Sequence, residues 1–489
     1  MWPLRGYQTD DTFIHLQYAR NLAEGHGLVF NVGERVYGST SPLWAVMLAE
    51  AIALGCDGLS AARAMGAAAA FVSILLFLQL MRRTVPTPAL RAAGTLGWAG
   101  NAWMLRWSMS GMETPVAVAL TLAGFVAFTE GRQWGARPLR TGALWALAAL
   151  TRPEAVFLLF LWGVCLLIDA RNRDGLHRLV FGALGPVVIY GSWLSFAGSY
   201  YGTFWPQTLA AKTAGGVGLA YHVGNLWRQA QIVGATDGLL AVVLALGLAF
   251  GGRRAWPTGT AAQRLVPWAW VVALPALYSA RGVPVLSRYL VPLLPVLAWL
   301  AWRAAERWWV GDDPAPARLR RAMALAALLA SLILAQNVIV YRTQVLPHVR
   351  TFSPALEASL VAWGRWFDRH TPPGAVIATP DIGAIGYHGR RRVVDLAGLV
   401  TPAMVEPLTR LSPEAVVENF EFAAFSRPDY LVDRSPVRFR LLATSPYARC
   451  LTPLGEARVP NLGVAHREPA VYSFYRVNWA VFDSLRAGR

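Results

Sequence analysis

Two adjacent carboxylates near the start of the chain are the side chains best suited to acid–base chemistry. Asp10 and Asp11 open the stretch DDTFIHLQYARNLAEGHG. A carboxylate with an ordinary pKa of about 4 is ionised at neutral pH, so either residue could take a proton from a hydroxyl group. The pair could also hold a divalent cation. Because aspartate is among the best residues for starting a helix, a helix cap without a catalytic role is the alternative interpretation.

Three cations could bind an anion such as a phosphate. Lys212 is the only lysine in the chain, and Arg152 and Arg288 lie at the ends of apolar runs. The alternatives are a lysine retained by chance and arginines that reach lipid headgroups. The remaining candidate substrate contacts are His15, Arg20, Glu113, Glu154, Asp381 and His388. For the glutamates the alternative is helix capping, and for residues 380–389 it is a structural turn after a strand.

The acidic pair lies at the start of an expected helix. Ile14, Tyr18 and Leu22 recur every four residues and form one apolar face, and Gly25 and Gly27 end the helix. A second helix is expected over residues 42–55, where Ser41 and a proline mark its start. We place this second helix at a membrane surface.

The composition indicates a protein that spans a membrane many times. Hydrophobic residues make up 55% of the chain and charged residues 15%, whereas soluble domains carry about a quarter charged residues. Many apolar runs approach the roughly 20 residues that a spanning helix needs. The candidate spans are 59–81, 90–107, 114–130, 141–150, 154–168, 178–196, 238–250, 265–280, 285–302 and 319–341.

The arginines predict the orientation of these spans. They gather in alternate loops, which include residues 82–91 and 303–321, and cytoplasmic loops are the ones rich in Lys and Arg. The same alternation places residues 1–58, 197–237 and 342–489 outside the cytoplasm. Because the net charge of +17 is concentrated in loops and not along a helix face, we do not expect nucleic acid as a partner.

Three regions follow from this pattern. Residues 1–58 form an extracytoplasmic segment with the acidic motif and surface helices, and we expect a membrane helix to precede it in the natural protein. Residues 59–341 form a transmembrane bundle of about ten helices. Residues 342–489 form a small extracytoplasmic α/β domain. Its strand-like runs are Val376–Ala378, Arg392–Val394, Tyr430–Val432 and Val471–Phe474.

Several stretches together resemble the GT-C glycosyltransferases, and most of all the lipid-dependent arabinofuranosyltransferases of cell-wall assembly and their uncharacterised relatives. The stretches are DDTFIHLQYARNLAEGHGLVFNVGERVYGSTSPLW, SGMET, LTRPE, YYGTFWPQTLAAKT, SRYLVPLLP and PDIGAIGYHGRRRVVDLAGLV. The resemblance implies a GT-C-like bundle of helices. It also implies transfer of a hexose or pentose from a polyprenyl-phosphate sugar to a glycan, lipid or protein on the outer face of the inner membrane.

By this resemblance, Asp10 or Asp11 would be the catalytic carboxylate. Lys212, Arg288 and Arg152 would neutralise the departing phosphate. The resemblance establishes no cofactor, because members of the family differ in their dependence on metals, and a divalent cation at Asp10 and Asp11 is left open. The alternative function is a transporter or lipid flippase for envelope glycan precursors, since charges at membrane edges also mark transport paths. A sensor with an outer binding domain is a third interpretation.

Overall fold

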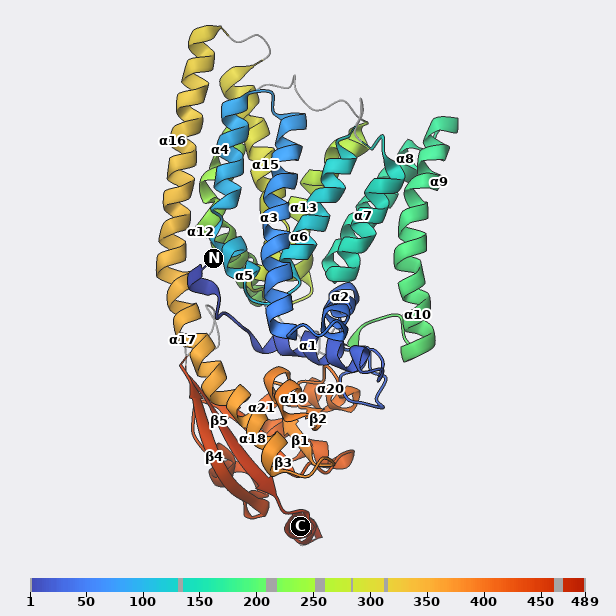
Figure 1. Cartoon of the computed structure of the whole chain (residues 1–489), viewed down its shortest axis with the longest axis vertical. Coiled ribbons are helices and arrows are strands. Elements are labelled where there is room, and N and C mark those ends of the chain that lie inside the picture. Colours follow the sequence, from blue (N-terminus) through green and yellow to red (C-terminus); the bar gives the residue numbers. More distant parts are fainter. Residues whose placement is uncertain are drawn as a thin grey trace. The chain divides into compact units, whose positions relative to one another are not determined.

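The chain forms two compact units, which Figure 1 shows in the colours of the sequence. The computed structural model describes residues 2–130, 135–207, 218–250, 260–282, 285–311, 315–460 and 469–487. The helical unit comprises Met1–Trp2, Arg63–Phe196 and Val217–Val345, and the sheet unit comprises Pro3–Ala62, Ala197–Gly216 and Leu346–Arg489. The segment with the acidic pair and the C-terminal segment, which we defined as separate regions, thus contribute to the same unit.

The helical unit is built from apolar helices that follow the predicted spans. They are α3 (Gly58–Thr84), α4 (Pro88–Ala99), α5 (Ala102–Ser108), α6 (Thr114–Phe128), α7 (Pro138–Thr151), α8 (Val156–Asp169), α9 (Arg173–Pro186), α10 (Ser192–Tyr201), α12 (Leu219–Phe250), α13 (Ala261–Ala280), α14 (Ser287–Leu290), α15 (Leu294–Ala305) and α16 (Pro316–Val340). Short helical turns extend some of them: η2 (Pro153–Ala155), η3 (Val187–Gly191), η5 (Glu306–Val310) and η6 (Tyr341–Val345).

Four helical stretches in the described part of the chain are long and apolar enough to cross a membrane. They are Gly58–Thr84, Arg173–Tyr201, Leu219–Phe250 and Pro316–His370. A spanning helix needs about 20 predominantly apolar residues, and each of these stretches exceeds that length. Their length and composition agree with the predicted multi-pass membrane protein.

Two predicted boundaries are wrong. Residues 219–237, expected in a loop, form the first part of α12. Polar side chains make this part look like a loop in the sequence, but they bond to the neighbouring helix α13: the Gln229 amide donates to the Pro275 carbonyl at 3.1 Å. The span expected over 90–107 is broken between α4 and α5, where the Asn101 side chain accepts a hydrogen bond from the Met104 N–H and starts a new helix.

The sheet unit is organised around a mixed sheet with the order β2-β1-β3-β5-β4. The strands are β1 (Val376–Thr379), β2 (Arg392–Asp395), β3 (Tyr430–Ser435), β4 (Leu451–Val459) and β5 (Ala470–Val477). β1 runs parallel to β2 and β3, and β5 runs antiparallel to β3 and β4. Four strands coincide with the predicted runs. β4 was missed because Pro453 and Gly455, at a bulge, disguise it as a turn.

The rest of the sheet unit contains short helices. They are η1 (Trp2–Leu4), α1 (Asp10–Ala23), α2 (Pro42–Ala53), α17 (Leu346–Leu356), η7 (Glu357–Val361), α18 (Ala362–His370), α19 (Gly383–Gly389), η8 (Pro402–Met404), α20 (Val405–Arg410), α21 (Pro413–Glu418), η9 (Glu421–Ala424), α22 (Arg440–Thr444), η10 (Ala448–Cys450) and α23 (Trp479–Ala487). The expected helices at residues 10–24 and 42–55 are both present. The stretch 380–389 contains a helix, α19, and not only a turn.

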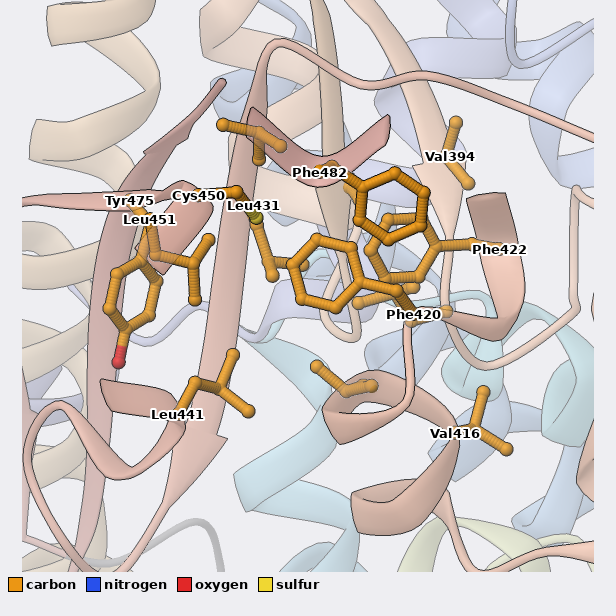
Figure 2. Packing of buried hydrophobic residues seen from close by; sticks show 14 of the residues in the cluster. Val394, Val416, Phe420, Phe422, Leu431, Leu441, Cys450, Leu451, Tyr475 and Phe482 are labelled. Atoms are coloured by element: carbon orange, nitrogen blue, oxygen red, sulfur yellow. The ribbon is translucent and has the colours of Figure 1, made fainter. Parts of the chain in front are cut away.

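An aromatic core lies beneath the sheet. Figure 2 shows the rings of Phe420, Phe422 and Phe482 gathered at its centre. The ring centroids of Phe420 and Phe482 are 5.5 Å apart and stacked, and those of Phe420 and Phe422 are 5.0 Å apart. Leu431 of β3 and Tyr475 of β5 belong to the same cluster. This packing fixes the strands whose ends carry the candidate site.

Helix α1 is an interior element of the sheet unit. It packs against both α2 and α19. Of the three residues predicted to form its apolar face, only Tyr18 is fully buried, whereas Ile14 and Leu22 are half-buried. A helix with neighbours on two sides buries more than one stripe, and the single-stripe prediction is therefore wrong in detail.

The segment after α1 completes the edge of the sheet. The Asn31 side chain accepts a hydrogen bond from the Val393 N–H and donates one to the Val393 carbonyl, both at 2.9 Å. An edge strand otherwise presents unpaired N–H and C=O groups. One amide side chain thus satisfies a residue of β2 and ties the N-terminal segment to the sheet.

Candidate functional site

The carboxylate of Asp10 caps a helix far away in the sequence. Its oxygens accept hydrogen bonds from the backbone N–H groups of Gly383 at 2.9 Å and Ala384 at 2.8 Å. These are the first residues of α19, and the first N–H groups of a helix have no partner within it. The alternative interpretation, in which Asp10 caps its own helix, is wrong. In the structure Thr9 precedes α1, and the carboxylate of Asp10 serves α19 instead.

Two further features fix this contact. A Cβ atom on Gly383 would lie 1.9 Å from the carbonyl oxygen of Asp10, so only glycine lets the two segments approach this closely. At the other end of α19, the Arg20 guanidinium donates to the Tyr387 carbonyl at 2.7 Å and lies 4.8 Å from the Tyr387 ring. An anion at the N-terminus and a cation at the C-terminus both favour a helix dipole. α1 therefore supplies α19 with both.

Asp381 lies beside Asp10 and is held by two other side chains. Arg434 Nη1 is 2.9 Å from each carboxylate oxygen, and the Tyr472 hydroxyl donates to Asp381 at 2.8 Å. Burial, followed by the charge of Asp381 and more weakly that of Asp11, raises the pKa of Asp10 from 3.8 to about 7, although the two backbone hydrogen bonds act in the opposite direction. We call Asp10, Asp11, Asp381, Arg434 and Tyr472 the acidic cluster.

The two histidine candidates of this unit lie on α1 and α19. His15 is buried within α1. The His388 ring packs edge-on against Phe13 at 4.9 Å, and burial together with the charge of Arg365 lowers the pKa of His388 to about 4. His388 is therefore neutral at physiological pH. Its position is that of a packing residue between the two helices.

A second cluster lies in the helical unit and brings together three sequence candidates. The Arg152 guanidinium donates to Glu113 at 2.6 Å and to Glu154 at 2.6 and 3.2 Å. The three side chains are only 6%, 4% and 12% exposed. The Tyr278 hydroxyl also donates to Glu154. The guanidinium of Arg152 is thus committed to two carboxylates.

Arg288 belongs to the same cluster through an aromatic ring. Arg152 and Arg288 lie 5.0 Å and 5.2 Å from the centroid of the Tyr289 ring, and Arg288 also lies 5.8 Å from the Trp107 ring. Trp107 in turn donates to the Ser287 hydroxyl at 2.9 Å. A cation over an aromatic face is attracted to it and keeps its charge. We call Arg152, Glu113, Glu154, Tyr278, Arg288 and Tyr289 the bundle cluster.

Two further sequence predictions concern Lys212 and a divalent cation. Lys212, the third predicted phosphate ligand, lies outside the described residues. Among the residues that the structure describes, no group of three or more His, Cys, Asp and Glu side chains is arranged to hold a metal ion.

The amino-acid sequence is similar to one described family and to two curated proteins. Residues 349–481 match a family described as "Domain of unknown function (DUF8728)". Two curated relatives are terminal beta-(1->2)-arabinofuranosyltransferases. The protein of Corynebacterium glutamicum is 30% identical over 305 residues, which cover 52% of this chain and 39% of the relative. That of Mycobacterium tuberculosis is 31% identical over 246 residues, 47% of this chain and 37% of the relative. The chain thus spans less than half the length of either relative.

The solved structures match over most of the chain. The ArnT protein of Cupriavidus metallidurans in the apo state has a TM-score of 0.58 at 15% identity and covers 94% of this chain and 93% of its own. The oligosaccharyltransferase of Archaeoglobus fulgidus has a TM-score of 0.51 at 11% identity, with 87% and 65% covered. The chain has the GT-C fold. Its homologues are arabinofuranosyltransferases, as the sequence motifs predicted.

Within this GT-C fold, sequence reasoning missed two members of the acidic cluster. Arg434 and Tyr472 lie directly opposite each other on β3 and β5. The sequence alone marks them only as an arginine and a tyrosine in strand-like runs. The pairing of those two strands was the missing information, because the register is what brings both side chains to Asp381.

The bundle cluster generates a prediction about stability. We expect Arg152→Gln to destabilise the protein by roughly 3–5 kcal/mol, because it leaves two buried glutamates without their guanidinium. Adding Glu113→Gln and Glu154→Gln to this variant should recover much of the loss. Thermal unfolding of the purified protein in detergent measures both changes. Equal melting temperatures for the wild type and Arg152→Gln would show that the ion pairs contribute nothing.

Proposed function

We propose that this protein is a membrane glycosyltransferase that moves a sugar from a polyprenyl-phosphate donor to an acceptor hydroxyl. The observation that carries the proposal is the acidic pair at the start of α1, anchored on α19. The homologous arabinofuranosyltransferases support it. One ArnT structure was solved with undecaprenyl phosphate, and the Archaeoglobus fulgidus enzyme was solved with a dolichol-phosphate. By analogy with these two bound lipids, we propose a polyprenyl phosphate as the carrier of the donor sugar.

In the proposed reaction Asp10 acts as the general base. The acceptor O–H gives its proton to the carboxylate, its oxygen forms a bond to the anomeric carbon, and the bond between that carbon and the phosphate oxygen breaks. The electron pair leaves with the polyprenyl phosphate. A base works best when its pKa is close to the working pH, and the pKa of Asp10 is about 7. Each carboxylate oxygen has two lone pairs, so the bonds to α19 leave room for a substrate proton.

The bundle cluster is our candidate for the donor phosphate. Arg288 lies over two aromatic rings, and a guanidinium offers five N–H donors in a planar fork that matches phosphate oxygens. Arg152, between Glu113 and Glu154, holds the cluster together and adds less to binding an anion. Lys212 stays a proposed second phosphate ligand. The donor leaves as an anion, and nearby cations lower the energy of that transition state.

The orientation in the membrane is a further part of the proposal. We propose that the protein lies in the inner membrane with the sheet unit outside the cytoplasm. Arginine-rich loops are typical of the cytoplasmic side, and they alternate along the chain with the segments that form the sheet unit. Sugar transfer would then take place on the outer face. The acceptor would be a glycan, a lipid or a protein exposed there.

Replacing each aspartate in turn distinguishes the proposed general base, Asp10, from its neighbour Asp11. Asp10→Asn should lower the transfer rate about 10²–10⁴-fold. The transfer rate is measured with polyprenyl-phosphate arabinofuranose as the donor and a synthetic arabinofuranoside as the acceptor. In Asp11→Asn the removal of a negative neighbour lowers the pKa of Asp10, so the pH below which transfer is lost should shift to a lower value. Rates from pH 5 to 9 measure both effects.

Asparagine at position 10 also weakens the contact with α19. It offers one acceptor oxygen where the carboxylate offers two, so one of the N–H groups of Gly383 and Ala384 would face an NH₂ group. Thermal unfolding of each variant therefore accompanies the rate measurement. A folded Asp10→Asn variant with full activity would refute the proposed base.

A native cysteine tests the orientation. Cys56, in the sheet unit, is exposed, whereas Cys165 and Cys450 are buried. In intact cells, or spheroplasts of cells with an outer membrane, a membrane-impermeant maleimide should label the wild-type protein and fail to label Cys56→Ser. Labelling that requires permeabilised membranes would place this unit in the cytoplasm.

A further inference from the structure

The ion pair of Asp381 and Arg434 lies where sheets of this kind bind ligands. Asp381 follows the end of β1, and Arg434 is near the end of β3, and these two strands are parallel neighbours. From β1 the chain passes through α19 to β2 on one side, and later returns as β3 on the other side. Ligands of open α/β sheets bind outside the carboxyl ends of the strands at such a reversal.

The pair is held by a buried side chain and is partly exposed. Tyr472, opposite Arg434 in the ladder of β3 and β5, is only 1% exposed, and its hydroxyl holds the Asp381 carboxylate at 2.8 Å. The side chains of Arg434 and Asp381 are 40% and 22% exposed. Two strands thus hold the polar ends in place while one side stays open to a ligand.

The charge of the surroundings indicates which ligand fits. Asp381 acts on Asp10 as a negative charge, and Arg434 compensates one of these two carboxylates. A phosphate brought to this position would meet a net negative charge. A neutral sugar would not. A carboxylate can accept from one sugar hydroxyl while the guanidinium donates to the oxygen of the next.

We propose that Asp381 and Arg434 bind neighbouring hydroxyl groups of the acceptor glycan and orient it toward the acidic pair of α1. Tyr472 acts as a positioning residue through Asp381. This inference rests on the proposed glycosyl transfer and names the recognition site for its acceptor. It assigns the donor phosphate and the acceptor sugar to different clusters of side chains.

Equilibrium binding to the full-length protein in detergent tests the inference. The acceptor probe is an octyl di-arabinofuranoside, and undecaprenyl phosphate serves as the donor-side probe. Arg434→Gln and Asp381→Asn should each weaken binding of the arabinofuranoside about 10–100-fold, since hydrogen bonds to charged groups are lost. Binding of undecaprenyl phosphate should not change, which also shows that the variants are folded. Arg434→Lys should recover part of the loss.

Arg427 provides a matched control. It forms a similar exposed pair with Asp483 in the same unit, at 2.8 and 3.0 Å. Arg427→Gln should leave binding of both probes unchanged. In the transfer assay Tyr472→Phe should raise the KM for the acceptor and leave kcat unchanged, a separation that a general loss of folded protein does not produce.

The outcomes distinguish this inference from the proposed function. A wild-type protein that does not bind the arabinofuranoside overturns the inference, and so does binding that is unaffected by both substitutions. Weaker binding of undecaprenyl phosphate in Arg434→Gln would assign the pair to the donor and equally overturn it. A wild-type protein that binds both probes in the expected manner but transfers no sugar contradicts the proposed function alone.

Discussion

The contact between α1 and α19 is the constraint on which the candidate site depends. α19 has seven residues, and a helix so short is not stable by itself. The carboxylate of Asp10 binds its first N–H groups, and the guanidinium of Arg20 binds a carbonyl in its last turn. Gly383 allows the close approach. The same contact determines where the acidic pair lies, because Asp10 cannot move without releasing α19.

This arrangement has an electrostatic consequence. In a strand–helix unit the first N–H groups of the helix are a common site for an anionic ligand. Here a side chain of the protein supplies that anion. Together with Asp381, it makes the carboxyl ends of β1 and β3 a negative region. Burial is the main cause of the raised pKa of Asp10, and the charge of Asp381 adds to it. Such a region suits the proposed proton transfer from a neutral sugar, whereas the phosphate of the proposed donor is better matched by a cation such as Arg288.

The sequence was most informative where a pattern is local. Apolar runs predicted a multi-pass membrane protein, strand-like runs predicted four strands, and the acidic motif together with the other quoted stretches predicted the GT-C fold. The predictions were wrong where distant segments decide the structure. Asp10 caps a helix that lies 373 residues further along the chain, and no pattern near Asp10 carries that information.

The same limit applies to the charged candidates. Arg152, Glu113 and Glu154 were predicted as separate contacts, and the structure joins them in one network. Arg434 and Tyr472 were missed because only the strand register places them beside Asp381. Residues 219–237 looked like a loop because their polar side chains are satisfied by α13, which the sequence does not reveal.

Hydrogen–deuterium exchange of α19 tests the central contact most directly. The amide groups of Gly383 and Ala384 are protected if the Asp10 carboxylate binds them. In the full-length protein, peptides that cover residues 383–389 should exchange faster in Asp10→Ala than in the wild type. Asp11→Ala should leave their exchange unchanged. Equal protection of α19 in the wild type and Asp10→Ala would contradict the account.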